Sequence, residues 1–134
     1  MQIKSEQEMI AFGEKIGTSL KAPAIIELVG DVGVGKTTFV RGLAKGLGIS
    51  VAITSPSFTI SKEYQGDGVR LVHYDYYRLN DPGLMADDLA ESISDENTVT
   101  VVEWGDSIKN LLPKNHQTIT IKYVDEATRE VSVK

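Results

Sequence analysis

The chain has 134 residues, of which 41% are hydrophobic and 25% are charged, so we expect one folded domain spanning 1–134 and exclude a disordered or low-complexity chain. Its net charge of −5 argues against direct binding of nucleic acid, because surfaces that bind phosphate backbones carry an excess of Lys and Arg. No cysteine, no apolar signal segment and no membrane-length apolar run is present, which together favour a cytoplasmic protein without disulfides, thiolate metal sites or membrane contact.

The first predicted element is a helix that begins after Ser5. Ser5 and Glu8 have the spacing of a capping box, and Pro23 follows the expected end of the helix. One face of this helix is apolar: Met9, Phe12, Ile16 and Leu20. We predict a packing helix that carries no chemistry.

The strongest motif lies between residues 24 and 48. Ala24 to Val29 predicts a buried strand, and Gly48 stands where a C-cap glycine ends a helix. Between them, apolar residues recur at helical spacing: Phe39, Val40, Leu43, Ala44 and Leu47. The loop residues Gly30, Gly35, Lys36 and Thr37 fit G-x-x-x-x-G-K-[ST], the phosphate-binding loop (P-loop), in the strand-loop-helix context that this motif requires.

This loop predicts a nucleotide site. Its glycines let backbone N–H groups converge on phosphate, and the helix that follows adds the positive end of its dipole. We expect Lys36 to be exposed without nucleotide and to bind the β and γ phosphates, and the Thr37 hydroxyl to ligate Mg²⁺. The expected nucleotide-binding residues are consecutive: Asp31, Val32, Gly33, Val34, Gly35, Lys36, Thr37 and Thr38.

A short β-rich run from Ile49 to Thr54 predicts the next strand. The segment after it is rich in hydroxyls, at Ser55, Ser57 and Thr59. It is either a switch that senses the γ-phosphate or a polar turn that begins at Ser-Pro.

Two runs, Thr59 to Tyr64 and Val69 to Tyr74, flank Gln65-Gly66-Asp67-Gly68 and predict an antiparallel hairpin. Asp75 follows near a strand end, where a carboxylate either reaches a bound metal or caps a turn. His73 is expected to pack, because a single histidine is not a metal site.

A helix is predicted from Asp81, with Pro82 at its first position. The second strong strand runs from Thr98 to Val102 and ends at Glu103 and Trp104. In P-loop proteins the neighbouring strand ends in an acid that holds Mg²⁺, so Glu103 is the candidate, although Asp is usual there. The alternative is a Glu that caps the next helix. Trp104 is expected near the nucleotide or facing a partner.

The last predicted elements are a short helix from Ser107 to Leu112 and a closing hairpin of Gln117 to Tyr123 with Thr128 to Val133. The predicted fold class is therefore α/β, with a P-loop NTPase-type sheet that is partly parallel, carries antiparallel hairpins and has helices on both faces.

The nucleotide is expected to be ATP, because no Asn-Lys-x-Asp segment for guanine is present. A small-molecule kinase needs a lid with arginines, and the chain has no lid-length insertion. Its arginines are few: Arg41, Arg70, Arg78 and Arg129. A phosphotransferase and a nucleotide-dependent assembly factor stay open as alternatives to an ATPase.

Six stretches together resemble the TsaE (YjeE) family, and the resemblance covers nearly the whole chain. In order they are Gly30 to Thr38, Ser55 to Thr59 with Glu63-Tyr64, His73 to Leu79, Val102-Glu103-Trp104 and Leu112-Pro113. The resemblance implies a small ATPase of tRNA threonylcarbamoyladenosine synthesis. Such a protein works with TsaB and TsaD, and it meets tRNA only indirectly through their complex.

The resemblance also implies roles for individual residues. Lys36 would bind phosphate, Thr37 would ligate Mg²⁺, and Asp75 and Glu103 would be the acids of the metal and hydrolytic site. The switch-like segment would hold Ser55, Ser57 and Thr59, and Trp104 would lie next to the site. Ser57 stands where Thr is common, and residues 84–97 lack the Gly-Leu-x-Glu-Tyr pattern of the family, which leaves a partner contact there in doubt.

Overall fold

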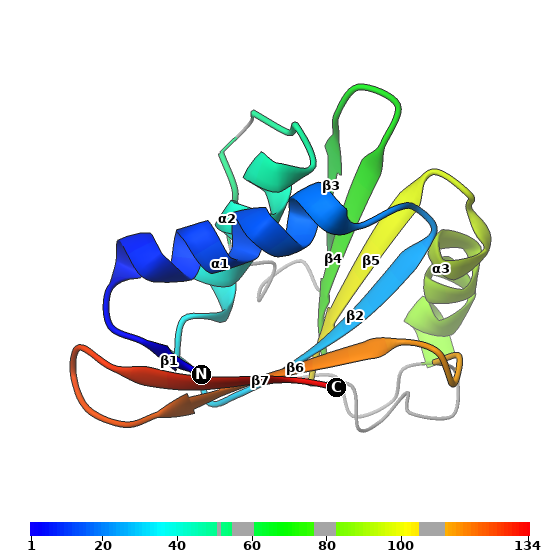
Figure 1. The fold of residues 1–134 in the computed structure, drawn as a ribbon. Coiled ribbons are helices and arrows are strands. Elements are labelled where there is room, and N and C mark those ends of the chain that lie inside the picture. The colour runs from blue at the N-terminus through cyan, green and yellow to red at the C-terminus, as the bar shows by residue number, and fades with distance from the viewer. Residues whose placement is uncertain (51, 55–60, 77–82, 105–111) are drawn as a thin grey trace.

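A seven-stranded mixed sheet organises the chain, in the order β1-β7-β6-β2-β5-β4-β3 (Figure 1). The structure is a computed structural model, and it describes residues 1–50, 52–54, 61–76, 83–104 and 112–134, without the side chains of 83–85. The strands are β1 (Gln2–Ile3), β2 (Ala24–Val29), β3 (Ser61–Gln65), β4 (Arg70–Asp75), β5 (Thr98–Glu103), β6 (Gln117–Tyr123) and β7 (Arg129–Val133). The helices are α1 (Glu6–Ser19), α2 (Lys36–Gly46) and α3 (Gly83–Ser94).

The centre of the sheet is parallel. Strand β2 pairs in parallel with β5 and β6, and β5 pairs in parallel with β4. Strands β3, β7 and β1 add antiparallel pairs at the two sides. The carboxyl ends of β2, β5 and β4 therefore meet at one edge, the edge at which open α/β sheets place their ligands. The predicted α/β class and both predicted hairpins are confirmed.

Helices cover both faces of the sheet, as the sequence predicted (Figure 1). Successive strand residues point to opposite faces, so Leu71 packs into the core beneath α1 and α2, whereas Val72 packs beneath α3. Strand β5 divides in the same way, with Val101 in the first cluster and Val102 in the second. Among the described residues, no helix has the length and apolar character of a membrane-spanning segment.

Helices α1 and α2 touch through their backbones. Gly13 and Gly17 lie on α1, and Gly42 and Gly46 lie on α2. A Cβ atom at any of the four would come within less than 3.0 Å of backbone atoms of the other helix. This contact was not predicted, because an isolated glycine in a helical pattern indicates only a weak helix position.

The predicted strand from Ile49 to Thr54 is wrong. The described residues of this stretch are irregular, and its first N–H group, that of Ile49, helps to close the end of α2. Gly48 has φ 81°, its N–H donates to the Lys45 carbonyl at 3.1 Å, and the Ile49 N–H donates to the Ala44 carbonyl at 2.9 Å. This is a Schellman ending, and it uses the Ile49 N–H that a strand would need. The apolar side chain of Ile49 instead packs into the core.

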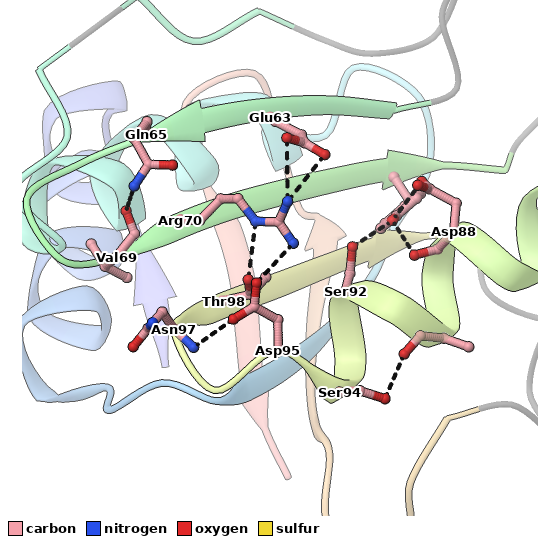
Figure 2. A network of polar contacts seen from close by, with 12 residues as sticks. Glu63, Gln65, Val69, Arg70, Asp88, Ser92, Ser94, Asp95, Asn97 and Thr98 are labelled. Atoms are coloured by element: carbon pink, nitrogen blue, oxygen red, sulfur yellow. Dashed lines mark hydrogen bonds and ion pairs between the residues drawn. The ribbon is translucent and has the colours of Figure 1, made fainter.

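Figure 2 shows two polar networks. One lies around Arg70, at the end of the sheet remote from the P-loop, and the other lies between the sheet and α3. Arg70 Nη2 lies 3.2 Å from Asp95, and its Nε donates to Thr98 at 3.1 Å. The Tyr74 hydroxyl donates to the Asp88 carboxylate at 2.8 Å and lies 2.7 Å from the Ser92 hydroxyl. Burial raises the pKa of Tyr74, so this hydroxyl keeps its proton at pH values well above those at which an exposed tyrosine loses it. Both networks are structural.

Several predictions fall outside the described residues. They are the switch-like segment with Ser55, Ser57 and Thr59, the helix start at Pro82, and the helix from Ser107 to residue 111. At the N-terminus the capping interaction is present, because Ser5 Oγ accepts the Glu8 N–H at 3.0 Å. The Glu8 carboxylate, however, accepts from the N–H of Lys4 at 3.3 Å, one residue before the expected partner.

Candidate nucleotide-binding site

The P-loop joins the end of β2 to the first residue of α2. Gly33 and Gly35 have φ values of 79° and 116°, a left-handed backbone that side chains other than glycine rarely adopt. Gly35 is the N-cap of α2 and supplies no side-chain hydrogen bond to the helix. The N–H groups of the first turn therefore face the loop without a capping side chain, which is the arrangement that binds an anion.

Lys36 is buried in this structure, and the expectation of an exposed side chain is wrong. Its exposed fraction is 6%. The ammonium donates to the Gly30 carbonyl at 2.5 Å, lies 3.4 Å from Glu103 Oε1, and sits 4.3 Å from the centre of the Trp104 ring. A buried ammonium is stabilised by a nearby carboxylate and carbonyl, so the charge predicted to bind phosphate is paired within the site.

The two predicted acids lie side by side at the carboxyl ends of adjacent parallel strands. Asp75 ends β4, Glu103 ends β5, and the two residues are paired in register. They are 6% and 3% exposed, respectively. Trp104 follows Glu103 with φ 57° and lies against Lys36. The structure thus brings together four residues that the sequence assigned to the site: Lys36, Asp75, Glu103 and Trp104.

His73 was predicted only to pack, and the structure places it against a site residue. Its side chain is fully buried on β4, and Nε2 forms a short contact with Glu103 Oε2. The two residues are 30 positions apart in sequence. No local pattern joins them, and only the parallel register of β4 and β5 brings them into contact.

Arg129 is a second residue that the sequence did not assign to the site. Its Nε donates to the Val34 carbonyl of the P-loop at 2.8 Å, and its guanidinium lies 4.9 Å from the centre of the Tyr123 ring. The turn between β6 and β7 is therefore tied to the loop. A cavity of about 380 Å³ lies here, lined by the loop at Gly33 to Gly35, the start of α1 at Ser5, and Arg129.

The other residues predicted to bind the nucleotide differ in how exposed they are. Asp31, Val32 and Gly33 are exposed at the tip, whereas Val34 is buried in the core. Thr37 and Thr38 are half-buried in the first turn of α2. Within the described ranges, no group of three or more His, Cys, Asp or Glu side chains is arranged to hold a metal by itself.

The donor set nevertheless fits Mg²⁺ bound together with a nucleotide. Mg²⁺ takes oxygen ligands, keeps several waters, and commonly uses one or two protein ligands with substrate phosphates. Glu103 Oε1 and the neighbouring Asp75 offer carboxylate oxygens, and Thr37 offers a hydroxyl at the start of α2.

Comparisons with known proteins show the family to which the chain belongs. Residues 3–131 match the family model described as "Threonylcarbamoyl adenosine biosynthesis protein TsaE". A Treponema pallidum protein named tRNA threonylcarbamoyladenosine biosynthesis protein TsaE is 36% identical over 130 residues, which are 97% of this chain and 96% of that protein. The Bacillus subtilis protein of the same name is 36% identical over 127 residues, 94% of this chain and 78% of that protein.

The fold is similar to a solved structure as well. The crystal structure of Bacillus subtilis YdiB superimposes with a TM-score of 0.80 at 31% sequence identity, covering 98% of this chain and 80% of that one. The family match spans both the P-loop and the strand that ends in Glu103. The chain therefore belongs to the TsaE family.

Proposed function

We propose that this chain binds and hydrolyses ATP, and that hydrolysis supports the TsaB–TsaD complex that adds the threonylcarbamoyl group to tRNA. One observation carries the ATPase part: a P-loop lysine lies 3.4 Å from a carboxylate that ends the neighbouring parallel strand. The partner and the pathway come from family membership and from the names of the relatives.

The residues of the site have separate roles in this proposal. The N–H groups of the loop and of the first α2 turn bind the phosphates, and Lys36 leaves Glu103 to neutralise the β and γ phosphates. Water attacks the γ phosphorus, the bond to the bridging oxygen breaks, and ADP and phosphate leave. Bound Mg²⁺, held by Thr37 and Glu103, would neutralise the negative charge that this reaction gathers on the phosphate oxygens. Asp75 would orient the water or the waters on the metal.

The cavity beside the loop is the proposed site of the nucleoside. It opens next to Gly33 and Gly35 and is bounded by the start of α1 and by Arg129. Of the arginines in the described residues, Arg41 pairs with Glu6 at the rim of this cavity, Arg70 pairs with Glu63 at the far end of the sheet, and Arg129 binds a loop carbonyl. We therefore propose that a partner completes the site, a step worth ~10³-fold or more where an arginine is supplied in trans.

Phosphate release tests the proposal when it is measured for the protein alone, for the TsaB–TsaD complex alone, and for the mixture. We expect slow release by the protein and a strong increase in the mixture. An increase that survives in Lys36→Ala would show that this P-loop is not the source of the activity. A rate for the protein alone that equals the rate of the mixture would contradict completion by a partner.

Two further measurements separate the alternatives. ATP labelled at the γ-phosphate yields free phosphate if the chain is an ATPase, and a labelled acceptor if it is a phosphotransferase. Ser57→Ala and Thr59→Ala in the mixture test the proposed switch segment. If both variants respond normally to the complex, the segment is a turn, and the partner assignment is unaffected.

A further inference from the structure

We propose that His73 is the positioning residue of the nucleotide site, holding one oxygen of Glu103 so that the other oxygen is presented to the nucleotide and its metal. The inference rests on the proposed function, because it concerns the acid assigned there to Mg²⁺. It adds a residue that has no role in that assignment.

The two oxygens of Glu103 have different partners. Oε2 meets His73 Nε2, and Oε1 lies 3.4 Å from Lys36 Nζ. When Lys36 turns to bind phosphate, only Oε1 is released. A glutamate carboxylate otherwise rotates easily about its last torsion, which has broad, two-fold minima. The contact with His73 removes this freedom and fixes which oxygen faces the loop.

The surroundings of His73 show that packing alone does not explain a histidine here. Its side chain is 0% exposed, and its register partner Val101 and the same-face neighbour Leu71 are apolar core residues. Its second ring nitrogen, Nδ1, has no hydrogen-bond partner among the described residues. A leucine or valine would avoid this unpaired nitrogen, which is unfavourable in a core. The contact with Glu103 is the interaction that a histidine adds.

Residues that orient a metal ligand through a hydrogen bond change metal affinity or activity by about ten- to a hundredfold when they are replaced. The matched variants are His73→Gln and His73→Asn. The glutamine amide nitrogen reaches about as far as Nε2, whereas the shorter asparagine nitrogen corresponds to Nδ1. We expect His73→Asn to lower kcat about tenfold or more with a smaller change in KM for ATP, and His73→Gln to recover most of the rate.

The deciding experiment measures binding rather than turnover. ADP affinity is measured by calorimetry in EDTA and in Mg²⁺, for the wild type, Glu103→Gln, His73→Asn and His73→Gln. In EDTA we expect both His73 variants to match the wild type, and Glu103→Gln to bind at least as tightly, because Lys36 no longer has to leave a carboxylate. The gain on adding Mg²⁺ should fall about tenfold in Glu103→Gln and His73→Asn but persist in His73→Gln.

Each contrary result has one meaning. If Glu103→Gln keeps the Mg²⁺ gain, the metal role of Glu103 is wrong and the inference falls with it. If Glu103→Gln loses the gain while His73→Asn keeps it, the proposed function stands and the inference alone is overturned. Equal losses in both His73 variants, or a loss already present in EDTA, would show a structural role for His73 and overturn the inference.

Discussion

The ion pair between Lys36 and Glu103 should stabilise the protein without nucleotide, and removing the lysine should therefore destabilise the fold. At 3.4 Å two unit charges attract by about 5 kcal/mol at an effective dielectric constant of about 20. Desolvation offsets much of this attraction, but removing one partner of a buried pair leaves a buried charge and typically costs about 3–5 kcal/mol. His73 still contacts the carboxylate in Lys36→Met, so we expect a loss of about 2–3 kcal/mol.

This loss corresponds to a decrease in Tm of about 7–10 °C for a chain of this size. Glu103→Gln should lower the free energy of unfolding by less, about 1–2 kcal/mol, because the Lys36 ammonium still donates a hydrogen bond to the Gly30 carbonyl. The double variant should lose less than the sum of the two, with a coupling of about 1–2 kcal/mol. Chemical denaturation without nucleotide or Mg²⁺ measures all three.

The chain offers a matched control pair on its surface. Lys45 Nζ lies 3.7 Å from Glu14 Oε1, but these side chains are 66% and 41% exposed. The same double-mutant cycle on this pair should give a coupling of at most about 0.5 kcal/mol. Strict additivity in the Lys36 and Glu103 cycle would refute the argument, because it would mean that the two charges do not interact in solution.

Three further predictions follow from other parts of the structure. Gly42→Ala should lower Tm by about 7 °C, since overpacking of about 3 kcal/mol exceeds the gain of about 1 kcal/mol in helix propensity. Lys15→Ala on the exposed face of α1 should change Tm little, and an unchanged Tm in Gly42→Ala would contradict the close helix contact. Arg129→Met should weaken ADP binding in EDTA about threefold to tenfold by calorimetry, because it loosens the loop, whereas Arg70→Met at the far end of the sheet should not. Equal affinities of wild type and Arg129→Met would remove Arg129 from the site. A backbone N–H donor holds the pKa of Asp95 below its usual range, so this carboxylate stabilises the fold at neutral pH and stops doing so as pH falls. The Tm difference between wild type and Asp95→Asn should begin to close as pH falls below about 5 and go on closing below the usual carboxylate pKa of about 4; a constant difference would exclude this linkage.

The sequence predicted the elements of this fold better than their contacts. The strand before Gly30, the helix after it and both hairpins carry local signals in spacing, turn residues and caps, and all are present. The strand predicted from Ile49 was wrong, because an apolar β-branched residue suits the end of a helix as well as a strand. The left-handed backbone of Gly48 produces the helix ending here. The register of the sheet has no local signal, so the contact between His73 and Glu103 was not predicted.

The contacts of the Lys36 side chain in this structure were also beyond the sequence. The motif predicts where Lys36 goes when phosphate is present, and it says nothing about what the ammonium contacts otherwise. The ammonium contacts Glu103 because β5 lies directly beside β2 and ends next to the loop that follows β2. The same reason explains Arg129, which reaches the loop from a strand 95 positions away in sequence.

The backbone contact between α1 and α2 has a consequence for how the protein tolerates change. Because α2 begins at Lys36 and rests on α1 at Gly42 and Gly46, sliding or tilting of the helix that follows the loop would bring backbone atoms of the two helices into collision. Adjustment to a ligand must come instead from side chains such as Lys36. A complete survey of single substitutions, scored by survival of ATP turnover, should then show two separate regions of intolerance. One follows the loop and the acids, and the other follows the four glycines of the helix contact, which lie outside the loop.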